Sequence, residues 1–198
     1  MAMYQAIAAT GKAIQRLLTD ARPREFADAT IRLLQAKDFQ SEPPVIQEGI
    51  SIYLYRVATN PTIRNLPPRP MSTGSRQRPS LPLDLFFLLT PWSADAETQL
   101  RLLGWAMRVL EDTPILSSGL LNAAEPEVTI FNADETVELI YDPLSLQDTA
   151  VIWENLRTPR IQPSATYVAR MVLLDSAVEM SSADLPEAHG SNLVKRPA

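Results

Sequence analysis

The sequence predicts a single α/β domain built on one mixed β-sheet flanked by helices. The N-terminal segment has a helical period of apolar residues, "ISIYLYRV" alternates with a period of two, and "LPLDLFFLLT" is apolar on both faces. A chain of 198 residues suits one domain. Hydrophobic residues make up 45% and charged residues 21%, so a core can be buried. We expect the domain to span residues 1–175.

The first segment is expected to be an amphipathic helix. Met3, Ile7, Ile14 and Leu18 recur at helical spacing, and the polar residues between them fall on other faces. The helix should end near Asp20, before "ARPRE".

A half-buried strand is predicted at "ISIYLYRV". Two sets of side chains alternate along it, Ile50, Ile52 and Leu54 on one side and Ser51, Tyr53 and Tyr55 on the other. The tyrosine side is amphipathic enough to meet a partner.

Residues 60–82 change character and predict a long arm. Prolines are interleaved there with four arginines, Arg64, Arg69, Arg76 and Arg78. Proline removes backbone donors and blocks helix, so an extended segment is expected. Long segments of this kind are commonly functional, but a solvated loop explains the composition equally well. Both interpretations stay open at this point.

The segment "LPLDLFFLLT" predicts the central strand of the sheet. Leu83, Leu85 and Phe87 lie on one face, whereas Phe86 and Leu88 lie on the other. A strand apolar on both faces is covered on both sides, either by helices or by a neighbouring subunit. The single charge inside it, Asp84, is expected to pair with a nearby arginine.

The clearest helix is "TPWSADAETQLRLLGWAMRVLEDTP". Ser93 is the expected N-terminal cap, and Pro114 lies just beyond the end. Trp105 falls at the border of the apolar face, with Arg101 and Arg108 about one turn away on either side. It is either an arginine-stacked surface residue or an anchor at a subunit contact.

The last third of the domain is expected to complete the sheet. Short strands are predicted around "EVTIF" and "TVELIY", and "ATYVARMVLL" should close the sheet. Between them, Ser145 and Asp148 form a capping box that begins a helix through Trp153, interpreted as a core residue. Residues 176–198 lose apolar periodicity, which predicts a mobile tail.

Catalytic chemistry finds little support in the residues. There is no cysteine, and the one histidine, His189, lies in the predicted tail. No phosphate-binding glycine motif is present. We therefore expect no catalytic residue, no bound metal and no cofactor. Acidic clusters are interpreted as solvated surface, although they leave a carboxylate-based hydrolase as a remote alternative; they are Glu111 with Asp112, and Asp134 with Glu135 and Glu138.

Charge and hydropathy limit the partners. A net charge of -5 would repel a phosphate backbone, so nucleic acid is not an expected partner. The N-terminus lacks the pattern of a signal peptide, and no apolar run approaches the roughly 18 residues that span a bilayer. We expect the protein to be made, folded and assembled in the cytoplasm, without inserting into a membrane.

The order of these segments resembles a specific family. The chain is similar to the tube-terminating cap proteins of extracellular contractile injection systems. The resemblance rests on the order of five segments, which are the N-terminal helix, "ISIYLYRVATNPTIRNLPPRP", "LPLDLFFLLTPW", "LLGWAMRVLEDTPIL" and "YVARMVLLDS". These are phage-tail-like particles of the virulence-cassette and antifeeding-prophage kind. The resemblance covers residues 4–175. It implies an α/β fold like that of contractile-tail terminators and a structural role without catalytic residues.

The same resemblance implies the partners. The protein would form a homo-oligomeric ring, expected to be a hexamer, that closes the inner tube at the end distal to the baseplate and helps to finish the sheath. A baseplate or adaptor subunit of the same machine is the main alternative. Whether the particle is released or membrane-anchored is left open. Candidate interface residues are Tyr53, Tyr55, Arg64, Arg69, Arg76, Arg78 and Trp105.

Overall fold

The structure is a computed structural model. It describes residues 4–42, 44–63, 66–70, 75–123, 128–156 and 161–180.

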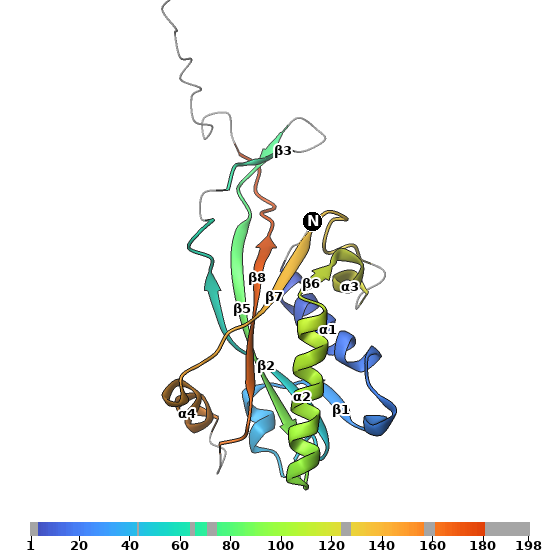
Figure 1. Cartoon of the computed structure of the whole chain (residues 1–198). Coiled ribbons are helices and arrows are strands. Elements are labelled where there is room, and N and C mark those ends of the chain that lie inside the picture. The colour runs from blue at the N-terminus through green and yellow to red at the C-terminus, as the bar shows by residue number, and fades with distance from the viewer. Residues whose placement is uncertain are drawn as a thin grey trace, which may run out of the picture.

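Six strands form one mixed sheet, in the order β1-β2-β5-β8-β7-β6 (Figure 1). Only β1 and β2 run parallel, and every other neighbouring pair is antiparallel. The predicted single mixed sheet flanked by helices is therefore confirmed. The strands are β1 (Thr30–Leu33), β2 (Gly49–Thr59), β5 (Leu81–Trp92), β6 (Ile115–Ser117), β7 (Thr136–Tyr141) and β8 (Ala165–Leu174).

Helices lie on both faces of this sheet. The long helices α1 (Ala6–Asp20) and α2 (Ala96–Asp112) pack on one face, called here the inner face. The short α3 (Ser118–Asn122) follows β6 on the same side. Helix α4 (Leu146–Asn155) packs on the opposite, outer face. Two short 3-10 helices, η1 (Arg24–Phe26) and η2 (Ala36–Gln40), lie in the loops before β1 and β2.

The central strand β5 is apolar on both faces because each face is covered. On the inner face Leu85 and Phe87 belong to the main core with α1 and α2, and Phe87 is 1% exposed. On the outer face Leu88, also 1% exposed, packs with Trp153 of α4. The prediction for β5 and the prediction that Trp153 is a core residue are both confirmed. Burying side chains of this size stabilises a fold by roughly 1.5–3 kcal/mol each.

Two local predictions were wrong. Helix α2 is capped by Asp95, whose carboxylate accepts the Thr98 N–H at 2.7 Å, and not by Ser93. Ser93 lies two positions too early, and its hydroxyl accepts the Asp95 N–H instead. The cap hydrogen bond lowers the pKa of Asp95. At the other end the helix stops at Asp112, before Pro114, as predicted.

The described part of "EVTIF" is not a strand. The side-chain amide of Asn122 binds this segment instead, accepting the N–H groups of Ile130 and Phe131 at 2.9 Å and donating to the Phe131 carbonyl at 2.8 Å. Ile130 and Phe131 lie in a loop, and their side chains are buried in the main core. This burial explains why the segment is apolar although it is not a strand. On the side away from β8, β7 pairs with β6, which lies earlier in the chain than this segment. By contrast, the Ser145 cap of α4 is confirmed, with Asp148 N–H donating to the hydroxyl at 3.1 Å.

The partner of Asp84 also differs from the prediction. Its carboxylate accepts two hydrogen bonds from the Asn60 amide, at 3.0 and 3.1 Å, and one from the Met171 N–H at 3.3 Å. No arginine pairs with it among the described residues. Met171 has a φ of 64°, which an L-residue adopts rarely, and sits where β8 bulges opposite Asp84. The buried carboxylate therefore serves to hold a strained bulge.

The arm begins where the sheet ends. Two short strands, β3 (Arg69–Pro70) and β4 (Arg76–Gln77), pair antiparallel. The first residues after β8 join them, since the Arg78 N–H donates to the Val178 carbonyl at 3.0 Å and the Met180 N–H to the Arg76 carbonyl at 2.7 Å. Residues 176–180 thus run beside the arm. Mobility of the tail as a whole stays a prediction, because residues 181–198 lie outside the described residues.

Candidate interaction surfaces

The two tyrosines of β2 lie half-buried on the outer face. The Tyr53 ring meets the Phe39 ring edge-on, with centroids 5.4 Å apart, and the Tyr55 ring packs against Phe86 at 6.1 Å. Both tyrosines border the cluster around Trp153. They therefore have apolar contacts within the subunit, and their predicted contact with a partner stays a prediction.

Tyr55 is expected to ionise late. Burial, with Asp142 nearby, raises the pKa of Tyr55 from 10.0 to about 12. Since the neutral phenol is favoured in the fold, its stabilising contribution is complete below pH 10 and is lost as the pH rises through about 12. An alkaline titration followed by tyrosinate absorbance should therefore show one late-ionising group more in the wild type than in Tyr55→Phe.

The stability of the two proteins should diverge over the same pH range. The wild type is expected to lose unfolding free energy more steeply than Tyr55→Phe between pH 10 and 12. A difference between the two absorbance titrations centred near pH 10, the ordinary pKa of tyrosine, would contradict the burial of this phenol. Burial also raises the pKa of Tyr167. Because Tyr167 is present in both proteins, it does not affect the difference between their stabilities.

Arg69 binds acidic groups of its own chain. Its guanidinium pairs with Asp175, whose side chain is 2% exposed, and lies 3.6 Å from Glu135. Ser80 donates a second hydrogen bond to Asp175 at 2.7 Å. Arg69 thus links the arm to the end of β8 and to the loop before β7, and its guanidinium is bound by carboxylates of its own subunit.

Replacing Arg69 with alanine should destabilise the monomer. The change leaves the Asp175 carboxylate buried with only Ser80 as a partner, a loss expected to cost about 1–3 kcal/mol after discounting for the partial exposure of Arg69. Arg78→Ala is the matched control, because that side chain is exposed. Urea unfolding measures both variants. Equal midpoints for the two would show that the Arg69 contacts add nothing to stability.

The remaining arginines of the arm differ from Arg69. Arg76 and Arg78 are exposed, and neither has an ion-pair partner in the described part of the chain. They are available to a partner's carboxylates. Arg64 lies outside the described residues, so its predicted role stays a prediction.

Trp105 is half-buried at the edge of the main core. Its ring packs against Phe26, with centroids 5.9 Å apart, and its buried Nε1 has no hydrogen-bond partner in the described structure. The flanking arginines bind elsewhere, Arg101 to Glu25 at 2.5 Å and Arg108 to Asp112. The arrangement favours a core-margin residue over an arginine-stacked one. The predicted role as a subunit anchor is untested.

Sequence reasoning missed an arginine on the outer face. Arg56 is exposed, and its guanidinium lies 4.8 Å from the centre of the Phe86 ring. Phe86 and Ile140 are half-buried apolar residues of the same outer face, and neither belongs to the cluster that packs with Trp153 of α4. The alternation of β2 and β5 places these residues on the outer face, but only the position of α4 shows which of them stay uncovered.

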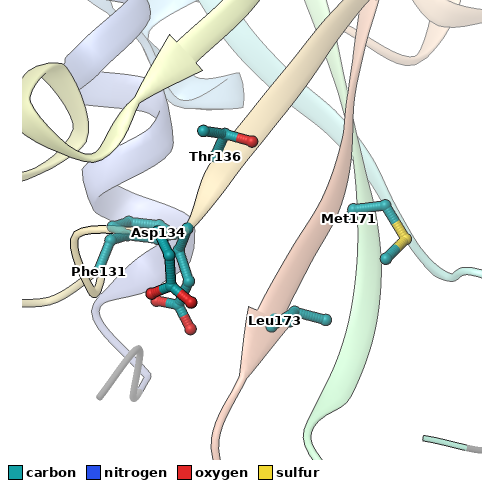
Figure 2. Close-up of a pocket in the computed structure, with 6 residues that line it drawn as sticks. Phe131, Asp134, Thr136, Met171 and Leu173 are labelled. Atoms are coloured by element: carbon teal, nitrogen blue, oxygen red, sulfur yellow. The ribbon is translucent and has the colours of Figure 1, made fainter.

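A shallow pocket opens beside the arm, between the loop before β7 and the end of β8 (Figure 2). Its volume is about 310 Å³. The lining combines acidic and apolar side chains, from Phe131, Asp134, Glu135, Thr136, Met171 and Leu173. Glu135 is bound by Arg69 and by the Asn132 N–H at 2.8 Å, so it is a structural carboxylate rather than one member of an acid/base pair.

The described residues contain no group of three histidine, cysteine, aspartate or glutamate side chains suited to holding a metal ion. No described helix has both the length and the apolar character to cross a bilayer.

The family model for the Pvc16 N-terminal domain matches residues 9–186 of the chain. The match extends from α1 to beyond β8 and so includes the whole sheet. The chain belongs to the Pvc16 N-terminal domain family. None of the curated proteins with which the chain was compared matches it significantly.

Two cryo-EM structures share the fold of this Pvc16 N-terminal domain. One is the PVC sheath/tube terminator of an extracellular contractile injection system in its extended state, with a TM-score of 0.61, 18% identity and coverage of 96% of this chain and 64% of that one. The other is the anti-feeding prophage cap, a tube terminating cap, with a TM-score of 0.59, 15% identity and coverage of 87% and 57%. The chain thus spans less than two thirds of either protein. The predicted similarity to tube terminators is confirmed at the level of fold.

Proposed function

We propose that this protein is a structural cap that terminates the inner tube of a phage-tail-like contractile injection system and helps to finish its sheath. The observation that carries the proposal is the Pvc16 N-terminal domain family match, which takes in the whole sheet. The likeness to a sheath/tube terminator and to a tube terminating cap supports it. The cap would assemble in the cytoplasm as a homo-oligomeric ring, a hexamer in the sixfold arrangement that the resemblance implies, and would become part of the injection particle.

The role is proposed to be non-enzymatic. The remote hydrolase alternative needs two carboxylates placed around a substrate. Glu135 is occupied by Arg69, Asp112 by Arg108, and Glu138 lies 4.0 Å from Arg170. These pairings are those of structural and surface acids. They favour assembly over turnover.

A baseplate or adaptor subunit is the alternative within the same machine. Particles purified with a short tag on this chain and labelled with gold separate the two roles. A cap places the label at the end distal to the baseplate. Label at the baseplate end would contradict the cap role and support the alternative.

The arm is proposed to contact a neighbouring subunit or the tube through Arg76 and Arg78. Prolines limit the freedom that such an arm loses on binding, and arginine binds carboxylates with two parallel hydrogen bonds. Replacing both with alanine should leave unfolding free energy within about 0.5 kcal/mol of wild type, as is usual for exposed positions. Association with purified tube protein should weaken, and its salt dependence should decrease because charged contacts have been removed.

Co-sedimentation with tubes at two salt concentrations measures this effect. Arg24→Ala with Arg32→Ala is the matched control, since both side chains are exposed and lie outside the arm. If the arm variant sediments with tubes as the wild type does at every salt concentration, the arm is only a solvated loop.

A further inference from the structure

Strand β2 has a free edge along its second half. β1 pairs with β2 only from Gly49 to Ile52, whereas β2 continues to Thr59 and pairs with β5 on its other side. From Tyr53 onward no strand of the described chain occupies the β1 side, and Figure 1 shows this half of β2 at the border of the sheet. Backbone groups on such an edge can pair with an added strand.

The opposite border of the sheet is also an edge. The three-residue strand β6 pairs with β7 on one side and is the last strand of the sheet. Its first residue, Ile115, is 59% exposed, and Ser117 is exposed as well. This border of the sheet is therefore also open to pairing with a strand of another chain.

The two edges lie level with one another across the sheet. Ala58 pairs with Asp84, which in turn faces the bulge at Arg170 and Met171. Arg170 pairs with Glu138, and Glu138 pairs with Ile115. One row of the sheet thus runs from Ala58 on β2 to Ile115 on β6. Both residues fall on the outer face, because the neighbouring row contains Leu85 and Ala169 of the inner core.

The strand directions match too. Each of the steps β2-β5, β5-β8, β8-β7 and β7-β6 is antiparallel, so β2 and β6 run in the same direction. A second copy, rotated about an axis along the strands, would present its β6 parallel to β2. That is the direction of β1, so β6 would take over the position that β1 leaves after Ile52. Exposed Arg56 beside the free edge and half-exposed Glu138 beside β6 are complementary in charge.

We propose that β6 of a second copy pairs with the free edge of β2, so that the sheets of neighbouring copies become continuous. A contact between two unlike edges repeats from copy to copy, and it forms a ring when the rotation between neighbours closes on itself. The inference rests on the proposed cap role and names the contact that would close its ring. Pairing of β2 with β2 across a twofold axis would instead produce only a dimer.

Cysteine cross-linking tests the pairing directly, since the chain has no cysteine of its own. The full-length double variant Ala58→Cys with Ile115→Cys, treated with a short bis-maleimide, should give a ladder of covalent multimers on a denaturing gel. Each single variant should run as a monomer on the same denaturing gel, because it has only one of the two cysteines that the cross-link needs. The control combines Ala58→Cys with Ile161→Cys. Ile161 is 54% exposed and lies before the first residue of β8, away from the row that joins Ala58 to Ile115. No ladder is expected for this control.

A charge placed on the edge provides a second readout. Ile115→Lys should lose assembly in light scattering, whereas Ile161→Lys, matched in exposure, should assemble like the wild type. Circular dichroism checks that both variants remain folded. Assembly of Ile115→Lys at the wild-type level would overturn the proposal.

Three further outcomes also overturn it. They are oligomers without a ladder in the double variant, dimers of Ala58→Cys alone, and a chain that remains monomeric both free and with tube. The cap role is judged separately. If the chain lies at the tube end but no ladder forms, only the edge pairing fails, whereas a ladder from a chain absent from the tube end contradicts the cap.

Discussion

Gly49→Ala is expected to destabilise the domain by at least about 3 kcal/mol, a loss reserved for backbone strain and core disruption. Gly49 has a φ of 145°, which L-residues rarely adopt. A Cβ there would lie 1.9 Å from the carbonyl oxygen of Thr30 and 2.6 Å from its nitrogen. Those atoms belong to the backbone of β1 and cannot rotate away. The substitution must therefore separate β1 from β2 at the start of their ladder, where Gly49 pairs with Thr30.

Gly104→Ala is the matched control. Gly104 lies within α2, and a Cβ there meets nothing within 4 Å. Alanine is the better helix former, so this variant should be more stable by about 0.5–1 kcal/mol. Urea unfolding of both variants measures the contrast. Equal stabilities would show that the close approach of β1 to β2 at Gly49 is not a feature of the folded protein.

Deleting this subunit from a strain that produces the particle should give tubes of uncontrolled length. If the protein closes the growing end, nothing in its absence limits addition of tube subunits, and the sheath lacks its final attachment. Electron microscopy of purified particles should show a broad length distribution, unstable sheaths, or both. Expressing the wild-type chain from a plasmid should restore uniform particles. Normal particles in the deletion strain would count against the cap role.

Much of the sheet could be predicted because its signals are local. The alternation in β2, the double-sided apolar pattern of β5 and the Ser145 cap of α4 each result from neighbouring residues, and each is confirmed. The end of α1 at Asp20 was predicted for the same reason.

Two of the errors arise where a side chain binds a segment that is not its neighbour in the sequence. Asn122 holds Ile130 and Phe131 as a loop, although their apolar pattern resembles that of a strand. Asp84 is bound by Asn60, which follows the neighbouring strand β2, rather than by an arginine. Such partners depend on tertiary contacts that periodicity does not encode.

The candidate surfaces show the same division. Composition alone marked the arm as unusual, but it could not distinguish Arg69, bound to buried Asp175, from exposed Arg76 and Arg78. The free edge of β2 was beyond sequence reasoning, because it depends on how far β1 extends beside it. The length of the β1–β2 pairing depends on where β1 begins and ends in the folded chain, and the loops at its ends have no hydrophobic periodicity from which this could be predicted.

A cryo-EM reconstruction of the tube end distal to the baseplate tests the central claim most directly. We predict a closed ring of this domain stacked on the last ring of tube subunits, with the six-stranded sheet recognisable in each copy. Edge pairing further predicts that β6 of each copy lies beside β2 of its neighbour. Finding this domain at the baseplate, or a tube end closed by a different protein, would contradict the cap role.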